Sequence, residues 1–121
     1  MVFRPALVAA VLASILLPAA ASAQQYPTIV GRWYSAPAEG GSYKDCDTHW
    51  GWEIQPMSLG NAMVQCRFND VARDGWQVTW RGKCSFEGQD IPGNIVVATE
   101  TNGELDVVFG DGSSVNDLRR C

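Results

Sequence analysis

The sequence has few basic residues and a single histidine, and these shortages exclude several classes of function. Nine Lys and Arg residues stand against thirteen Asp and Glu residues, which gives a formal net charge of −4. No cluster of Lys or Arg occurs, so the chain lacks the basic patch with which proteins bind nucleic acid or anionic membranes. With one histidine and no Cys-x-x-Cys, neither a zinc knuckle nor a thioredoxin-type redox pair is available.

The sequence also lacks motifs for catalysis and metal binding. His49 lies on the same side of an extended chain as Asp45 and Asp47, and these residue types can act together as metal ligands. They alternate with apolar Trp50 and Trp52, so we interpret them as a solvent-exposed side and expect no metal. No Gly-x-Ser-x-Gly elbow accompanies the histidine, and the acidic residues near predicted turns are typical of turn chemistry. We therefore predict no enzyme activity, no catalytic residue and no cofactor.

The only long apolar run lies in the first 23 residues. A short positive start with Arg4 precedes an apolar stretch over residues 6–20 and a small-residue cleavage signature that ends at Ala23. We predict a signal peptide over residues 1–23 and a single domain over residues 24–121. Cleavage would leave 98 of the 121 residues and a formal charge of −5, because it removes one basic residue and no acid. No second run of spanning length follows, so we expect a periplasmic or secreted protein without membrane insertion.

Four cysteines belong to the predicted mature domain. An even count in a short exported chain indicates two disulfides, and each would contribute about 3 to 4 kcal/mol by restricting the unfolded chain. Such crosslinks compensate for the modest core of a small domain. Three pairings are possible and the sequence does not choose between them. Our preference joins Cys46 with Cys66 and Cys84 with Cys121.

Alternation of apolar and polar residues dominates the rest of the chain, with Gly, Asn, Asp and Pro at turn positions. Hairpin turns are expected at residues 72–75, at Asn102-Gly103 and at residues 110–112. The pattern predicts an all-β fold, a small antiparallel meander barrel or sandwich of about seven strands with two disulfides. The expected strands cover residues 29–35, 49–55, 62–69, 76–84, 94–101, 105–109 and 114–120, and residues 56–61 could form one helical turn.

The five tryptophans are candidates for the core and for a surface. Trp50, Trp52, Trp76 and Trp80 lie on the apolar sides of their strands, so we expect them in the core. Trp33 is adjacent to Tyr34, and neighbouring residues of a strand point to opposite faces. One of these two rings should therefore point outward.

The polar loop over residues 35–47 is the best candidate for a binding surface. It combines flexible Gly40-Gly41, an aromatic residue and a predicted crosslink at Cys46. Loops on a rigid scaffold commonly make contacts, whereas the alternative is a solvated connection that touches nothing. The predicted binding residues are Tyr43, Lys44, Trp33 and Tyr34.

Several of these residues also carry a resemblance. The elements in chain order are Gly31-x-Trp33, Cys46, Trp52-x-Ile54, Cys66, Cys84 and Arg120-Cys121. With them the chain resembles small exported four-cysteine proteins of alphaproteobacteria, over most of the predicted domain. That resemblance implies the fold and the disulfides, and it implies no particular activity. More distantly, the size and β architecture are similar to periplasmic barrels that inhibit lysozymes or metalloproteases.

We therefore expect a non-enzymatic periplasmic binding or inhibitor domain that contacts a protein target through the loop 35–47. The partner would be an envelope or foreign protein, such as a basic hydrolase like lysozyme, toward which an acidic domain is steered. One alternative is a small-ligand carrier with an aromatic-lined inner face, although eight-stranded barrels hold at most one small ligand. The other alternative is a purely structural envelope component.

Overall fold

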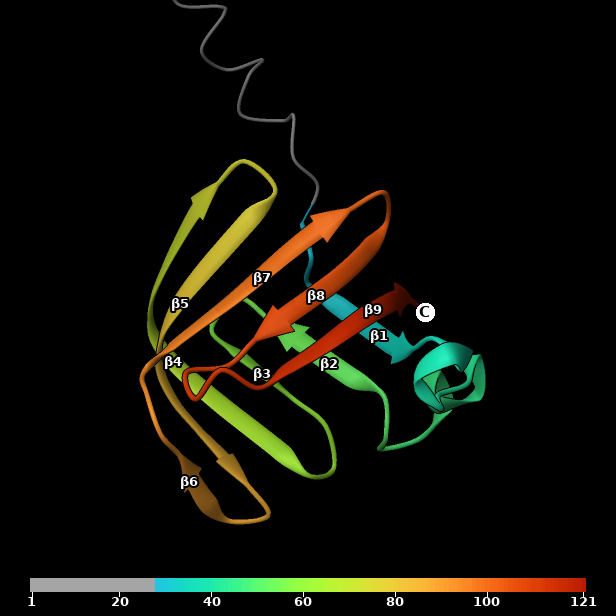
Figure 1. The fold of residues 1–121 in the computed structure, drawn as a ribbon, viewed down its shortest axis with the longest axis horizontal. Coiled ribbons are helices and arrows are strands. Elements are labelled where there is room, and N and C mark those ends of the chain that lie inside the picture. The colour runs from blue at the N-terminus through green and yellow to red at the C-terminus, as the bar shows by residue number, and fades with distance from the viewer. Residues whose placement is uncertain (1–27) are drawn as a thin grey trace, which may run out of the picture.

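The computed structural model describes residues 28–121, so the predicted signal peptide, residues 1–23, lies outside the described residues. The described part forms nine strands and two short 3-10 helices (Figure 1). It contains no helix with the length and apolar character that crossing a membrane requires. The elements are β1 (Gly31–Ser35), η2 (Pro37–Glu39), η3 (Tyr43–Asp47), β2 (Trp52–Gln55), β3 (Ser58–Gly60), β4 (Val64–Asp74), β5 (Gln77–Phe86), β6 (Gln89–Ile91), β7 (Ile95–Thr101), β8 (Glu104–Val108) and β9 (Ser114–Arg120).

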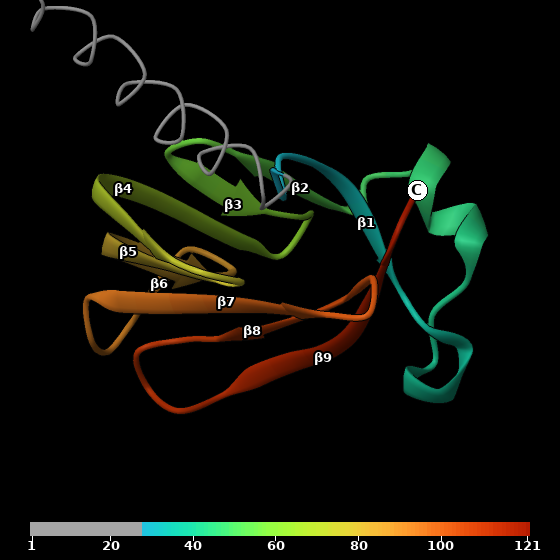
Figure 2. The ribbon, with the colours of Figure 1, turned by 90° about the horizontal axis from the view of Figure 1, so that it is seen from above.

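Eight of these strands close into an antiparallel barrel. Neighbouring strands pair in the order β4-β3-β2-β1-β9-β8-β7-β5, and β5 then pairs with β4 to complete the ring. The short β6 is an additional strand that pairs with β5 next to the start of β7. Figure 2 shows β1 to β4 along one side of the ring and β7 to β9 along the other. The predicted antiparallel all-β fold with two disulfides is confirmed, and it takes the form of a barrel.

The connections between strands gather at two opposite ends of the barrel. The connections β1–β2, β3–β4 and β8–β9 lie at one end together with β6, and we call this end the mouth. The turns β2–β3, β4–β5 and β7–β8 lie at the other end. The predicted hairpin turn at Asn102-Gly103 is confirmed, with φ of 54° and 84° that suit Asn and Gly. The turn over residues 110–112 is also present, between β8 and β9.

Inward-facing side chains fill the interior of the barrel. The rings of Phe68 and Trp80 stack with their centroids 4.9 Å apart. The indole N–H of Trp80 donates to the carbonyl of Pro56, and that of Trp33 donates to the carbonyl of Ile29, so each of these two buried indoles has a hydrogen-bond partner. The most deeply buried side chains are Trp33, Ile54, Cys66, Trp80, Val96, Leu105, Val107 and Leu118.

Two strands were absent from the sequence prediction because they are too short to show alternation. Residues 56–61 do not form a helical turn. Instead Pro56 and Met57 form the turn between β2 and β3, and β3 has one buried residue, Leu59. The other short strand, β6, follows a turn at Glu87-Gly88 in which both residues have positive φ. A strand of three residues with one inward side chain has no periodicity to detect.

The predicted turn over residues 72–75 is wrong. Strand β4 continues to Asp74, which pairs with Gln77, so the two-residue turn consists of Gly75 and Trp76. Residues 69–74 are all exposed, because this part of the hairpin extends beyond the short β3. Both faces of this part of β4 are therefore in contact with solvent, although Val78 and Trp80 of the paired β5 are buried. Trp76 lies at the tip of the hairpin, 48% exposed, so its predicted place in the core is wrong.

Trp50 is also on the surface, 49% exposed, whereas Trp52 and Trp80 are buried as predicted. The strand containing Trp52 begins later than predicted, because residues 48–51 turn. Gly51 is required there, since a Cβ atom would lie 2.6 Å from the carbonyl oxygen of Asp45. Alternation from Trp52 therefore does not extend back to Trp50.

The preferred pairing of the cysteines is wrong: the structure joins Cys46 to Cys121 and Cys66 to Cys84. A bulge between Phe68 and Asp70 shifts the register of β4, and Cys66 consequently lies directly opposite Cys84. Cys121 follows β9, which pairs with β1, and the loop after β1 brings Cys46 back to that edge. Pairing between distant strands thus determines which cysteines meet. Two disulfides indicate an oxidising compartment outside the cytoplasm.

Candidate functional site

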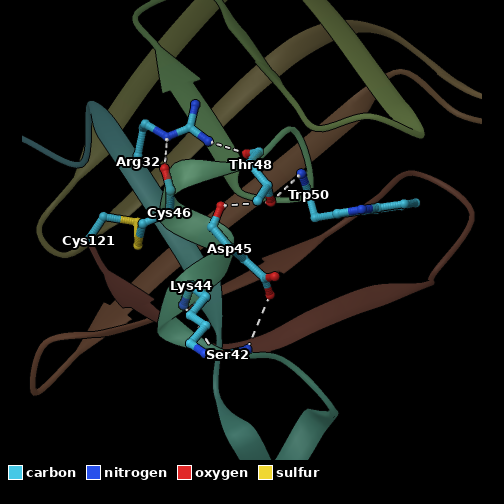
Figure 3. The surroundings of a disulfide bond; sticks show 8 residues. All are labelled: Arg32, Ser42, Lys44, Asp45, Cys46, Thr48, Trp50 and Cys121. Atoms are coloured by element: carbon cyan, nitrogen blue, oxygen red, sulfur yellow. Dashed lines mark hydrogen bonds between the residues drawn. A yellow bond between two sulfur atoms is a disulfide. The ribbon is translucent and has the colours of Figure 1, made fainter.

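The loop between β1 and β2 folds back along the outside of the barrel, where η3 contacts β1. Its central turn is fixed by a capping box around Ser42. The Ser42 hydroxyl accepts a hydrogen bond from the backbone N–H of Lys44, and the Asp45 carboxylate accepts one from the backbone N–H of Ser42 (Figure 3). Such reciprocal bonds satisfy N–H groups that a helix start leaves unpaired. The loop has a defined shape despite its Gly-rich sequence.

Arg32 and a disulfide attach this loop to the barrel wall. The Arg32 guanidinium donates to the carbonyl of Cys46 at 3.1 Å and to that of Thr48 at 2.7 Å (Figure 3). Cys46 is bonded to Cys121, whose backbone N–H donates to the carbonyl of Arg32. Arg32 points outward because its neighbour Trp33 points into the barrel. One residue of β1 therefore stabilises the loop through both its side chain and its backbone.

The structure separates the four predicted binding residues into two groups. Tyr43 is 66% exposed, Lys44 is exposed, and Tyr34 is half-buried on the outer face of β1. The rings of Tyr34 and Tyr43 meet edge to face with centroids 6.3 Å apart. Trp33 is completely buried, so its ring offers no surface to a partner. The predicted site thus consists of Tyr43 and Lys44, supported by Tyr34.

Two of the residues considered as metal ligands, Asp45 and His49, make other contacts. The Asp45 carboxylate caps the loop turn, and the exposed His49 ring lies against the ring of Trp50 at 5.1 Å between centroids. Across residues 28–121, no three His, Cys, Asp or Glu side chains are grouped closely enough to hold a metal ion. Asp45 therefore serves to fix the turn of the loop.

A second concave surface, which the sequence did not predict, lies at the mouth of the barrel. It is an open cavity of about 540 Å³, which we call the mouth cavity. A smaller hollow of about 360 Å³ under the loop shares Trp52, Asn61 and Val115 with it. The polar residues that line the mouth cavity include Asp90, Asp111 and Ser113. The apolar lining residues include Trp52, Val64, Phe86, Ile91, Phe109 and Val115.

Asp111 stabilises the turn that borders the mouth cavity. Its Oδ1 atom accepts hydrogen bonds from the Ser113 hydroxyl at 2.6 Å and from the Ser113 backbone N–H at 3.0 Å. Both donors favour the charged carboxylate, and the Ser113 hydroxyl has the larger effect. They hold the pKa of Asp111 below its ordinary value. Because the folded-state pKa is the lower one, the bonds stabilise the turn above the ordinary aspartate pKa. That stabilisation is lost as pH falls through the lowered pKa.

Replacing Ser113 by alanine is expected to raise the pKa of Asp111 part of the way to its ordinary value. The variant removes the hydroxyl donor, while the backbone N–H of residue 113 still donates. A carboxyl-carbon NMR titration measures this change directly. Ser114→Ala is the matched control, because the Ser114 hydroxyl accepts from Asn116. An unchanged Asp111 titration in Ser113→Ala would contradict the assigned cause.

Comparison with known proteins gives no match from which a function could be inferred, so the two surfaces are interpreted from their own chemistry. No family model matches the chain, no curated protein matches it, and no solved structure matches it. The resemblance to small exported four-cysteine proteins accordingly stays a prediction. Two surfaces within residues 28–121 are candidates for a function, the attached loop with Tyr43 and the mouth cavity.

Proposed function

We propose that this protein is a non-enzymatic binding domain of the periplasm or extracellular space that contacts a protein partner through the loop 35–47. The observation that carries this proposal is the 66% exposure of Tyr43 on a loop held by a disulfide, Arg32 and a capping box. Tyrosine is enriched among the residues that dominate interface energies. A loop already held in shape loses less conformational entropy on binding.

The geometry around Tyr43 supports contact with a macromolecule. Its ring rests on the ring of Tyr34, which limits the number of conformations available to the exposed side chain. Lys44 lies next to it and is also exposed. Asp45, Cys46 and Arg32 are engaged in holding the loop, which supports a binding role over a catalytic one for this segment.

The charge of the chain supports a basic partner. A formal net charge of −4 attracts cationic proteins, and such steering raises association rates at low ionic strength. A basic hydrolase such as lysozyme has the required charge. Association should then weaken as salt is added, because screening shortens the range of the attraction.

Substitution of Tyr43 by alanine is expected to weaken binding to such a partner by about tenfold or more, as loss of an interface anchor does. The mature protein is immobilised, and association with lysozyme is measured by interferometry at several salt concentrations, alongside inhibition of lysozyme activity. Trp76→Ala is the matched control, since Trp76 is an exposed aromatic residue at the opposite end of the barrel.

Three results would contradict the proposal. The first is an absence of lysozyme binding combined with an absence of any partner in affinity capture from envelope extract. The second is equal affinity of Tyr43→Ala and the unmodified protein. The third is an equal loss of affinity in Tyr43→Ala and Trp76→Ala, which would show that binding does not depend on the loop.

A carrier function is supported by one observation, the mouth cavity of about 540 Å³. The packed interior, with Trp33, Leu105 and Leu118 completely buried, leaves no room for a ligand inside the barrel. A carried molecule would therefore bind in the mouth cavity and not inside the barrel.

A further inference from the structure

The mouth cavity has a floor made by the outermost layer of the core. Trp52, Val64 and Phe109 are 7%, 8% and 6% exposed, whereas Leu105, deeper in the barrel, is completely buried. The rings of Trp52 and Phe109 lie 6.2 Å apart between centroids, inclined at 35°. This floor presents aromatic and aliphatic surface to solvent and does not admit a molecule into the barrel.

The walls of the mouth cavity are apolar as well. Phe86, at the end of β5, is 45% exposed, and Ile91 on β6 packs partly against the core. Both residues belong to the pair of strands that extends past the start of β7. A cavity of about 540 Å³ is within the range that small-molecule sites occupy. Its apolar floor and wall suit a small molecule with a hydrocarbon or aromatic body.

The charges of the lining have one sign. Asp90 and Asp111 both contribute to the mouth cavity, and its lining contains no Lys, Arg or His. Ser113 orients the Asp111 carboxylate through Oδ1, which leaves the second oxygen available to accept a bond from a ligand. Aromatic rings near a cation add a favourable electrostatic term. An anionic ligand would meet repulsion at this rim.

From these observations we infer that the mouth cavity binds a small organic cation with an apolar body, of the arylalkylamine class. The body lies on Trp52 and Phe109 against Phe86, and the ammonium group lies at the rim beside Asp111. This inference concerns a different surface from the loop 35–47 and does not depend on the protein-binding proposal.

Three probes with the same phenylbutyl body test the inference: 4-phenylbutylamine, 4-phenylbutanol and 4-phenylbutyrate. Binding to the mature protein is measured by isothermal titration calorimetry at low salt, and the location by amide chemical-shift changes. The amine is expected to bind about tenfold more tightly than the carboxylate, with the alcohol between them, because the charge of the probe changes while its apolar surface does not. Shifts are expected in residues 61–64, 86–91 and 109–115.

Two mouth variants separate the charge from the apolar contact. Asp90→Asn combined with Asp111→Asn is expected to lower the affinity for the amine about fivefold and to leave the alcohol unchanged. Asparagine keeps an Oδ1 acceptor for Ser113, so the turn is preserved. Phe86→Ser is expected to weaken the amine and the alcohol alike, since it removes an exposed wall of the cavity.

Matched controls lie at the opposite end of the barrel. Asp70→Asn with Asp74→Asn changes the net charge by the same amount on the β4–β5 hairpin, and Trp76→Ser removes an equally exposed aromatic ring. Neither control should alter binding. Absence of binding by the amine, equal affinity of all three probes, or equal weakening by control and mouth variants would each overturn the inference.

Discussion

Replacing Cys46 and Cys121 together by serine is expected to lower the free energy of unfolding by about 4 to 5 kcal/mol. The bond joins residues 75 positions apart, and a crosslink over a long segment restricts the unfolded chain strongly. The same change should loosen the loop, because its covalent attachment is lost and the two hydrogen bonds from Arg32 and the ring contact between Tyr34 and Tyr43 remain. Urea denaturation measures the first effect, and amide hydrogen exchange over residues 42–48 measures the second.

The matched control is the double serine variant of Cys66 and Cys84. This bond spans 18 positions, so its loss is expected to cost about 3 kcal/mol. It lies between β4 and β5, away from the loop, and amide exchange over residues 42–48 should stay slow. Equal exchange in the two variants would contradict the assignment of Cys46–Cys121 as the bond that shapes the loop.

Replacing Trp33 by alanine is expected to lower the free energy of unfolding by about 4 kcal/mol, as removal of a large, completely buried ring does. The indole donates to the carbonyl of Ile29, and the Arg120 guanidinium lies 4.4 Å from the centre of the ring. Arg120 also donates to the carbonyls of Thr28 and Val30. The variant therefore removes a hydrogen bond and a cation–π contact as well as core volume.

Trp50→Ala provides the comparison for Trp33→Ala, because Trp50 is 49% exposed in a turn. Its loss is expected to cost about 1 kcal/mol or less, as substitutions at exposed positions do. Urea denaturation of both variants measures the difference. Similar losses for the two tryptophans would show that Trp33 does not occupy the packed interior.

Alternation along the strands contained enough information to predict the fold class. The segments around Trp52, Trp80 and Leu105 each alternate because one face lies in the barrel and the other in water. Turn chemistry located the β7–β8 hairpin, since Asn102 and Gly103 tolerate positive φ. Local patterns of this kind depend on neighbouring residues, which the sequence displays directly.

Features that depend on distant residues were not predictable in this way. The bulge at Asn69 places Cys66 opposite Cys84, and no local signal in β4 marks it. The exposed tip of the β4–β5 hairpin has the composition of a loop although it is a strand. Alternation alone predicts a core position for Trp76, because the sequence does not reveal where the barrel ends.

The two candidate sites also differ in whether neighbouring or distant residues form them. The loop 35–47 was predictable, because Gly40-Gly41, Tyr43 and Cys46 lie close together in the sequence. The mouth cavity was not, because Trp52, Phe86 and Phe109 come from three separate segments that only the closed barrel brings together. A cavity assembled in this way has no contiguous motif.

The position of the Cys46–Cys121 bond also has a consequence for the order of assembly. Every strand from β2 to β9 lies between the two cysteines. The Cys66–Cys84 bond can form within a single hairpin, whereas the longer bond needs β9 to be docked beside β1. An incompletely folded chain would therefore carry the loop of Tyr43 without its crosslink, and this loop would take its final shape only after the last strand has docked.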